Sequence, residues 1–166
     1  LNICLAKGED MLTRIPEVLI RFRCHLEAWC SDISKMYNML QLNDDALPYS
    51  LFLYDESLDE AVPPNVYVMT AAWYGVSSTG NQANVAVERL ALAHAAELPA
   101  SLGPLSVDRY MDDIDSGADT RADVDEQVRQ TKECLLRGGF KPKFVAHSGE
   151  APPEAASQDG RTVGVL

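Results

Sequence analysis

The chain has 166 residues, 46% of them hydrophobic and 23% charged, which is the composition of one globular domain and excludes a disordered chain. No run of eighteen apolar residues occurs, so no membrane span is expected. A net charge of −11 argues against nucleic-acid binding by this stretch alone, unless basic surface lies in a longer polypeptide or the acids gather at a cation site.

The start of the chain and its cysteines and histidines narrow the class of protein further. The chain begins with Leu1 rather than Met, which suggests a piece of a longer polypeptide, and its first nine residues do not have the pattern of a signal peptide. The cysteines are scattered and form no CxxC pair, and the three histidines stand far apart. This spacing predicts free thiols in a reducing compartment and no zinc site.

The first half of the chain predicts a helix, a strand, a second helix and a hairpin. Apolar residues fall at helical spacing over residues 11–22 and predict a helix there. Pro16 interrupts this stretch, so the helix is expected to begin near that residue. Alternation predicts a strand over residues 26–32, ending at Asp32, and helical spacing resumes over residues 33–42. Two runs rich in strand formers, separated by a proline-containing turn, predict a hairpin: residues 49–54 and 66–74.

The second half predicts a long helix, an acidic hairpin, a capped helix and a final strand. These elements fall at residues 77–96, 107–114, 120–139 and 140–146, with loop beyond them until a short apolar end at residues 163–166. Thr120 and Asp123 form an approximate capping box, and two glycines close the same helix. The order of elements predicts an α+β fold, one domain over residues 1–166 in which helices pack on one face of an antiparallel sheet.

Asp112 and Asp113 are adjacent carboxylates between strand-like flanks. Neighbours on a regular strand point to opposite faces, so both can serve one site only at a tight hairpin turn. Their repulsion would be relieved by a divalent cation, which favours oxygen ligands. The alternative is a solvated acidic turn, which is also the interpretation given to Asp108, Asp115 and Asp119, as surface acids or a helix cap.

The order of motifs resembles that of reverse transcriptases. An aspartate with an aromatic residue five positions later (Asp32, Tyr37) precedes a glycine-led loop at Gly75, a helix, and the tetrapeptide Tyr110-Met111-Asp112-Asp113. The chain is most similar to the polymerases of BEL/Pao-type long-terminal-repeat retrotransposons, and the likeness covers nearly all of it. Further segments carry this likeness: Leu1 to Leu5, Leu19-Ile20-Arg21-Phe22-Arg23, Asp32-Ile33-Ser34-Lys35-Met36-Tyr37, Ser116-Gly117-Ala118-Asp119-Thr120 and Gly138-Gly139-Phe140.

This resemblance implies a polymerase palm with part of the fingers, and an RNA-directed DNA polymerase that uses two Mg²⁺ ions, with Mn²⁺ as a substitute. It implies that Asp32, Asp112 and Asp113 are catalytic and hold the metals, together with the Ile33 main-chain carbonyl. The other residues that it implies in substrate binding are Ile33, Tyr37, Gly75, Gln82, Tyr110, Met111 and Lys143.

Each of these substrate-binding residues also has an ordinary structural interpretation. Tyr37 could be a core aromatic, and Tyr110 and Met111 could simply pack in the hairpin. Gly75 could be a turn glycine, Gln82 a solvated helix residue, and Lys143, with Lys141, a surface lysine on an edge strand.

The resemblance also implies partners and a location. The partners are an RNA or DNA template with its primer, deoxynucleoside triphosphates, and the remainder of a Gag-Pol-like polyprotein. The location is the cytoplasm, within virus-like particles. The thumb, ribonuclease H and integrase are not expected within these residues. The chain departs from the family at Ala72-Trp73-Tyr74-Gly75 and Ser78-Thr79-Gly80-Asn81. Two alternatives remain: an inactive retrotransposon remnant that binds nucleic acid or protein, and an unrelated acidic cation-binding domain.

Overall fold

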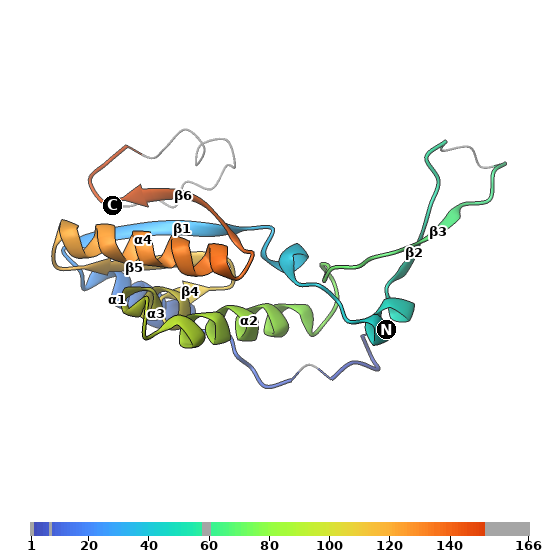
Figure 1. The fold of residues 1–166 in the computed structure, drawn as a ribbon, viewed down its shortest axis with the longest axis horizontal. Helices are drawn as coiled ribbons and strands as arrows, with labels where there is room; N and C mark the ends of the chain where they lie inside the picture. Colours follow the sequence, from blue (N-terminus) through green and yellow to red (C-terminus); the bar gives the residue numbers. More distant parts are fainter. Residues whose placement is uncertain (1, 7, 58–60, 152–166) are drawn as a thin grey trace.

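The computed structural model describes residues 2–6, 8–57 and 61–151 (Figure 1). The expected apolar end at residues 163–166 and most of the loop before it lie outside this part of the chain. The elements in chain order are α1 (Ile15–Arg23), β1 (Glu27–Ser34), η1 (Met36–Met39), η2 (Asp44–Tyr49), β2 (Leu51–Tyr54), β3 (Asn65–Val68), α2 (Thr79–His94), η3 (Pro99–Ser101), α3 (Leu102–Ser106), β4 (Arg109–Tyr110), β5 (Asp113–Ala118), α4 (Arg121–Arg137) and β6 (Lys141–His147).

The body of the molecule is a four-stranded sheet with packed helices, and a separate two-stranded hairpin completes an α+β fold, as predicted. The sheet order is β4-β5-β1-β6, and every neighbouring pair is antiparallel. Strand β1 is therefore central, between β5 and β6. Helix α4 lies across the sheet and contacts β1, β5 and β6 (Figure 1).

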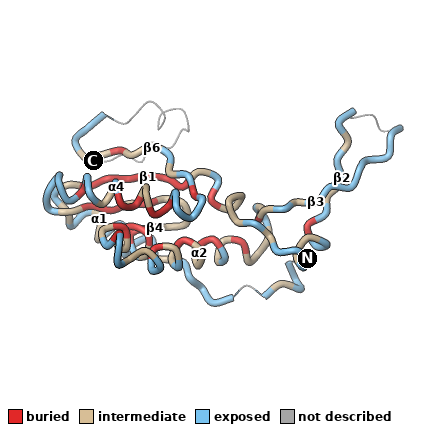
Figure 2. The backbone as a smooth tube through the Cα atoms, viewed as in Figure 1, coloured by how far each residue is buried: buried red, intermediate tan, exposed pale blue. Residues whose placement is uncertain are grey.

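The hydrophobic core lies between the sheet and the helices α2 and α4. Trp29 and Ile33 of β1 and Ile114 of β5 are at most 1% exposed and pack with apolar residues of both helices. Figure 2 shows this buried layer along β1, α4 and α2. Because alternate residues of a strand point to opposite faces, Cys30 and Asp32 of β1 and their partners Asp115 and Asp113 of β5 point away from the core.

Local signals placed two helices where the sequence predicted them. Helix α1 begins at Ile15 with Pro16 in its first turn, where a proline has no hydrogen bond to lose. Helix α4 begins after Thr120, whose hydroxyl accepts a hydrogen bond from the Asp123 amide, and ends at Gly138. The capping prediction is therefore confirmed.

The helix predicted over residues 33–42 is wrong. Strand β1 continues to Ser34, because Ile33 and Ser34 pair with Pro142 and Lys141 of β6. Lys35 then has a φ of +50°, and only the short 3₁₀ turn η1 follows. Sheet pairing on β1 has overridden the local helical spacing. The strand predicted over residues 66–74 is also shorter, and the sequence missed η2, η3 and α3.

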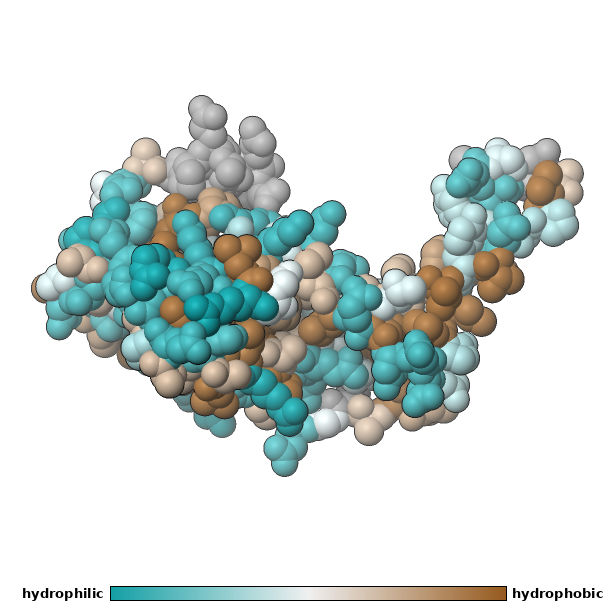
Figure 3. All heavy atoms as spheres, in the orientation of Figure 1, coloured by the Kyte–Doolittle hydropathy of each residue, from teal (hydrophilic) through white to brown (hydrophobic). Residues whose placement is uncertain are grey.

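The hairpin β2–β3 projects from the body (Figure 1). Leu51 pairs with Val68 and Leu53 with Val66, so one face of the hairpin is aliphatic, and all four side chains are exposed. Figure 3 shows the apolar side chains gathered on this arm. In the described part of the chain, no helix is long and apolar enough to cross a bilayer.

Candidate functional site

The site is built on a two-residue turn that joins β4 to β5. Tyr110 pairs with Asp113, so Met111 and Asp112 alone form the loop of the hairpin. Met111 has a φ of +57°, as the tight turns that match the twist of hairpin strands require. The predicted hairpin is present, and Asp112 and Asp113 stand at its tip.

Asp32 reaches the same turn from the central strand. It is the cross-strand partner of Asp113, and the Ile33 amide donates a 2.8 Å hydrogen bond to the Asp112 carbonyl. Side chains of directly paired residues lie on one face, with their Cβ atoms about 4.5–5.5 Å apart. The fold thus brings Asp32 beside Asp112 and Asp113, although some eighty residues separate them in the chain.

The acids lie on the face of the sheet opposite the core. Cys30 and Asp32 alternate with the core residues Trp29 and Ile33, and Cys30 pairs with Asp115. Burial, Asp115 and Asp113 raise the pKa of the Cys30 thiol to about 11. Burial and the charges of Asp113 and Asp108 raise the pKa of Asp115 to about 6. Negative charge is therefore concentrated on this face, where a cation would be stabilised.

A positively charged side chain, that of Lys143, lies beside Asp32. The Lys143 ammonium lies 3.2 Å from Asp32 Oδ1, and the Asp32 side chain is only 6% exposed. Lys143 lies within a register shift between β1 and β6, after Pro142, which pairs with Ile33, and before Val145, which pairs with Ser31. The interpretation of Lys143 as an edge-strand surface lysine is therefore incomplete, because its side chain turns to the acidic face. Lys141 is exposed.

Tyr37 and Tyr110 lie beside the turn. The Tyr37 hydroxyl donates to Met111 Sδ at 3.9 Å, and its ring meets the ring of Tyr74 edge-on at 5.1 Å. Burial, followed by the charge of Asp112, raises the pKa of Tyr37. Tyr110 is half-buried in β4. Tyr37 is thus placed between the core and the acidic turn.

Gly75 lies in the loop before α2, and Gln82 lies in the first turn of that helix. Gly75 has a φ of +87°, and a side chain there would meet open space, so its backbone angle accounts for the glycine. Its carbonyl accepts a 2.7 Å hydrogen bond from Asn2. Gln82 is exposed on α2 and bonds to Ser78 of the preceding turn.

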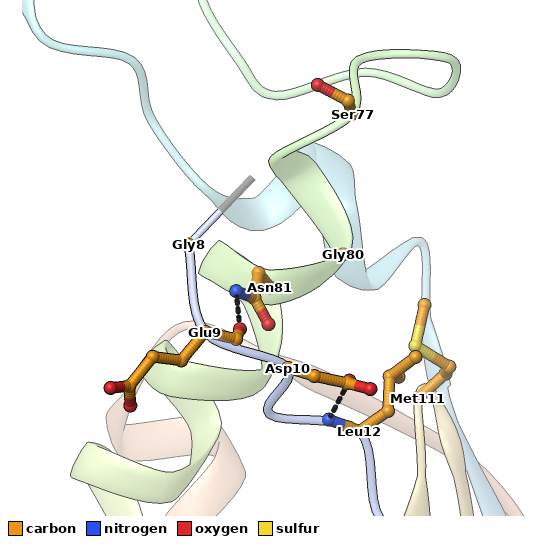
Figure 4. Close-up of a pocket in the computed structure, with 8 residues that line it drawn as sticks. All are labelled: Gly8, Glu9, Asp10, Leu12, Ser77, Gly80, Asn81 and Met111. Atoms are coloured by element: carbon orange, nitrogen blue, oxygen red, sulfur yellow. Dashed lines mark hydrogen bonds between the residues drawn. The ribbon is translucent and has the colours of Figure 1, made fainter. Parts of the chain in front are cut away.

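A cavity of about 360 Å³ adjoins the turn. It lies between the N-terminal segment around Gly8 and Asp10 and the start of α2 at Gly80, with Met111 on its wall (Figure 4). The Asn81 side chain holds this segment in place, accepting from the Met11 amide and donating to the Glu9 carbonyl. The turn therefore adjoins the acidic face of the sheet through Asp113 and this hollow through Met111.

The donor set fits a hard divalent cation. Two paired carboxylates and a third in the adjoining turn are the oxygen ligands that Mg²⁺ and Mn²⁺ prefer, and an ammonium group already neutralises one of them. Within the described ranges, no three His, Cys, Asp or Glu side chains are gathered as a ready-made metal cluster. The Ile33 side chain is buried in the core, and its carbonyl as a ligand stays a prediction.

Two buried polar groups were not predicted. Asp108 is 7% exposed and binds both Arg21 of α1 and Ser116 of β5, so the interpretation of Asp108 as a solvated acid is wrong. Asp115 is also partly buried, whereas Asp119 is exposed as expected. Arg109 is 4% exposed and bonds to Asn84 of α2. Their partners are distant in the chain, and no local pattern announces such pairs.

Comparison of the chain with protein-family models finds no match, and comparison with curated proteins finds none either.

Proposed function

We propose that this chain is the palm, with part of the fingers, of a reverse transcriptase similar to those of BEL/Pao-type retrotransposons. One observation carries the proposal: Asp32 pairs with Asp113 across two strands while Asp112 occupies the adjoining two-residue turn. This is the arrangement that two-metal nucleotidyl transfer needs, and the Tyr-Met-Asp-Asp tetrapeptide stands at that turn. The implied reaction joins a deoxynucleotide to a primer 3′-hydroxyl.

In this proposal Asp32, Asp112 and Asp113 hold two Mg²⁺ ions, which supply activation of the 3′-hydroxyl and neutralisation of the departing pyrophosphate when bound. The Lys143 ammonium lies at the edge of the same site and carries a proton at Nζ, where it can meet the leaving phosphate. Tyr37, held by Met111 and Tyr74, offers a ring edge beside the turn against which the sugar of the nucleotide can pack.

The second candidate is a catalytically inactive remnant that binds nucleic acid or a protein. The net charge of −11 favours it, because a template-primer carries dense negative charge. The pairing of Asp32 with Asp113, with Asp112 in the adjoining turn, favours catalysis, since an inactive domain has no need of a like-charged pair across two strands.

Primer extension separates the two candidates. The full-length polypeptide that contains this chain is assayed on an RNA template with a DNA primer and Mg²⁺, beside Asp112→Asn. Asp119→Asn is the matched control, because Asp119 is an exposed acid outside the site. We expect extension by the wild type and the control and none by Asp112→Asn. Equal extension by all three would refute the assigned role, and no extension by the wild type would favour the binding function.

A further inference from the structure

Arg109 ties helices α2 and α3 to the turn. It is on β4, next to the tetrapeptide, and its side chain is almost wholly buried at 4% exposure. Its guanidinium donates hydrogen bonds to oxygens of α3, α2 and the turn: the Leu105 carbonyl at 3.1 Å, the Asn84 side-chain oxygen at 2.7 Å, the Asn84 carbonyl at 3.4 Å, and the Met111 carbonyl.

Those hydrogen-bond partners are neutral oxygens, so the buried charge has no contact carboxylate among them. Burial lowers the pKa of Arg109 to about 10, and the charges of Glu88 and Asp112 oppose that shift. A buried guanidinium is unfavourable unless nearby anions stabilise it. Asp112, the residue directly after Met111 and one of the acids of the site, is one of these anions. Arg109 is therefore coupled to the turn by charge as well as by hydrogen bonds.

Asn84 holds the other end of Met111. Its amide donates to Met111 Sδ at 3.6 Å while its oxygen accepts from Arg109. Gly80 lies one helical turn earlier on the same face of α2, and a side chain there would meet the Met111 methyl at 3.2 Å. The face of α2 formed by Gly80 and Asn84 is thus shaped to receive the Met111 side chain.

The contacts matter because Met111 has a positive φ of +57°, which is unfavourable for a residue with a side chain. If these bonds are lost, only the pairing of Tyr110 with Asp113 still holds the turn, and Met111 is freer to leave this backbone angle. A change of φ at Met111 redirects the next residue, Asp112. The direction of one carboxylate in the site therefore depends on Asn84 and Arg109.

We infer that Arg109 and Asn84 form a turn clamp, a pair of positioning residues that fix Met111 in its left-handed conformation and thereby aim Asp112 at the metal site. The effect on catalysis rests on the proposed function. The effect on the turn does not, and it can be measured in the chain itself.

The first test follows the environment of the Met111 side chain by nuclear magnetic resonance. The chain is labelled with ¹³C at its five methionine methyls, and the Met111 signal is assigned with Met111→Leu. We expect Arg109→Met to shift or broaden the Met111 signal, and Arg109→Lys, which keeps the charge, to shift it less. Arg89→Met, at an exposed arginine of α2, is the matched surface control. Val124→Ala, at a buried residue of α4, controls for a general loss of stability.

A Met111 signal that stays at its wild-type position in Arg109→Met, or that moves as far in Val124→Ala, would overturn the clamp. The second test is primer extension by the full-length polypeptide. We expect kcat to fall roughly 10- to 100-fold in Arg109→Met, the size of effect that a displacement of about 1 Å produces, with little change in KM for the nucleotide and partial recovery in Arg109→Lys. An unchanged kcat beside a displaced Met111 signal would refute the aiming of Asp112. No extension by the wild type would instead refute the proposed function, and the methyl spectrum would still decide the clamp.

Discussion

Replacement of Lys143 by methionine should destabilise the chain and at the same time sensitise it to Mg²⁺. The ammonium lies 3.2 Å from Asp32 Oδ1, with side-chain exposures of 31% for Lys143 and 6% for Asp32. Methionine preserves the length of the side chain and removes the charge. The Asp32 carboxylate of β1 then stays buried without its ammonium partner, beside the acidic residues of β5.

The magnitude follows from these exposures. Removal of one partner from a fully buried ion pair costs about 3–5 kcal/mol, and an exposed pair contributes about 0–1 kcal/mol. Because water reaches a third of the Lys143 side chain, we expect about 1–2 kcal/mol. For a chain of this size that corresponds to a melting temperature lower by roughly 2–8 °C.

The assay is thermal unfolding by circular dichroism at pH 7, first in EDTA and then with increasing Mg²⁺. Lys141→Met is the matched control, since Lys141 is an exposed lysine of the same strand. A cation that binds the folded state stabilises it by an amount that grows with the ratio of its concentration to its Kd. Because Lys143→Met has no ammonium beside Asp32, Mg²⁺ should bind it more tightly and raise its melting temperature more than that of the wild type. Equal melting of the two lysine variants in EDTA, or a larger response to Mg²⁺ in the wild type, would refute the reasoning.

The remaining predictions concern helix capping, proton binding and thiol reactivity. Thr120→Ala removes the N-cap of α4, so urea unfolding should show a loss of about 1 kcal/mol, and an unchanged midpoint would contradict the cap. The pKa of Asp115 is raised to about 6, so the folded chain binds this proton more tightly than the unfolded chain, and Asp115 lowers stability as the pH rises from about 4 to about 6. In EDTA, Asp115→Asn should therefore gain more stability at pH 7 than at pH 4, and an equal gain would contradict the shift. Iodoacetamide at pH 8 should modify exposed Cys24 and spare Cys30, which is buried with a pKa of about 11; equal rates by mass spectrometry would show otherwise.

Elements with local signals could be predicted from the sequence. Helix α4 has its cap, its apolar spacing and its closing glycines within one continuous segment, and it forms where they predict. Residues 33–42 have equally good helical spacing, yet Ile33 remains in β1 because its amide bonds to Asp112 and its strand pairs with β6. Partners that arrive from about eighty and one hundred residues later are invisible to a local pattern.

The same distinction applies to the site. The motif around Asp112 and Asp113 is continuous in the sequence and can be recognised there, and Asp32 is found by its spacing from an aromatic residue. Arg109 and Asn84 have no such mark, because their role depends on the register of α2 against a hairpin formed twenty-five residues later. The hydrogen bonds of a buried polar group are set by tertiary packing, which the sequence expresses only through the complete fold.

We expect Asp32, Asp112 and Asp113 to serve one cation site, and a titration of this chain with Mn²⁺ measures that binding without any substrate. Electron paramagnetic resonance can follow free Mn²⁺ during a titration, with Mg²⁺ as competitor. We expect saturable Mn²⁺ binding that Mg²⁺ displaces, weakened roughly tenfold or more by Asp32→Asn and by Asp112→Asn and unaffected by Asp119→Asn. Binding of the same strength in all four proteins would contradict it.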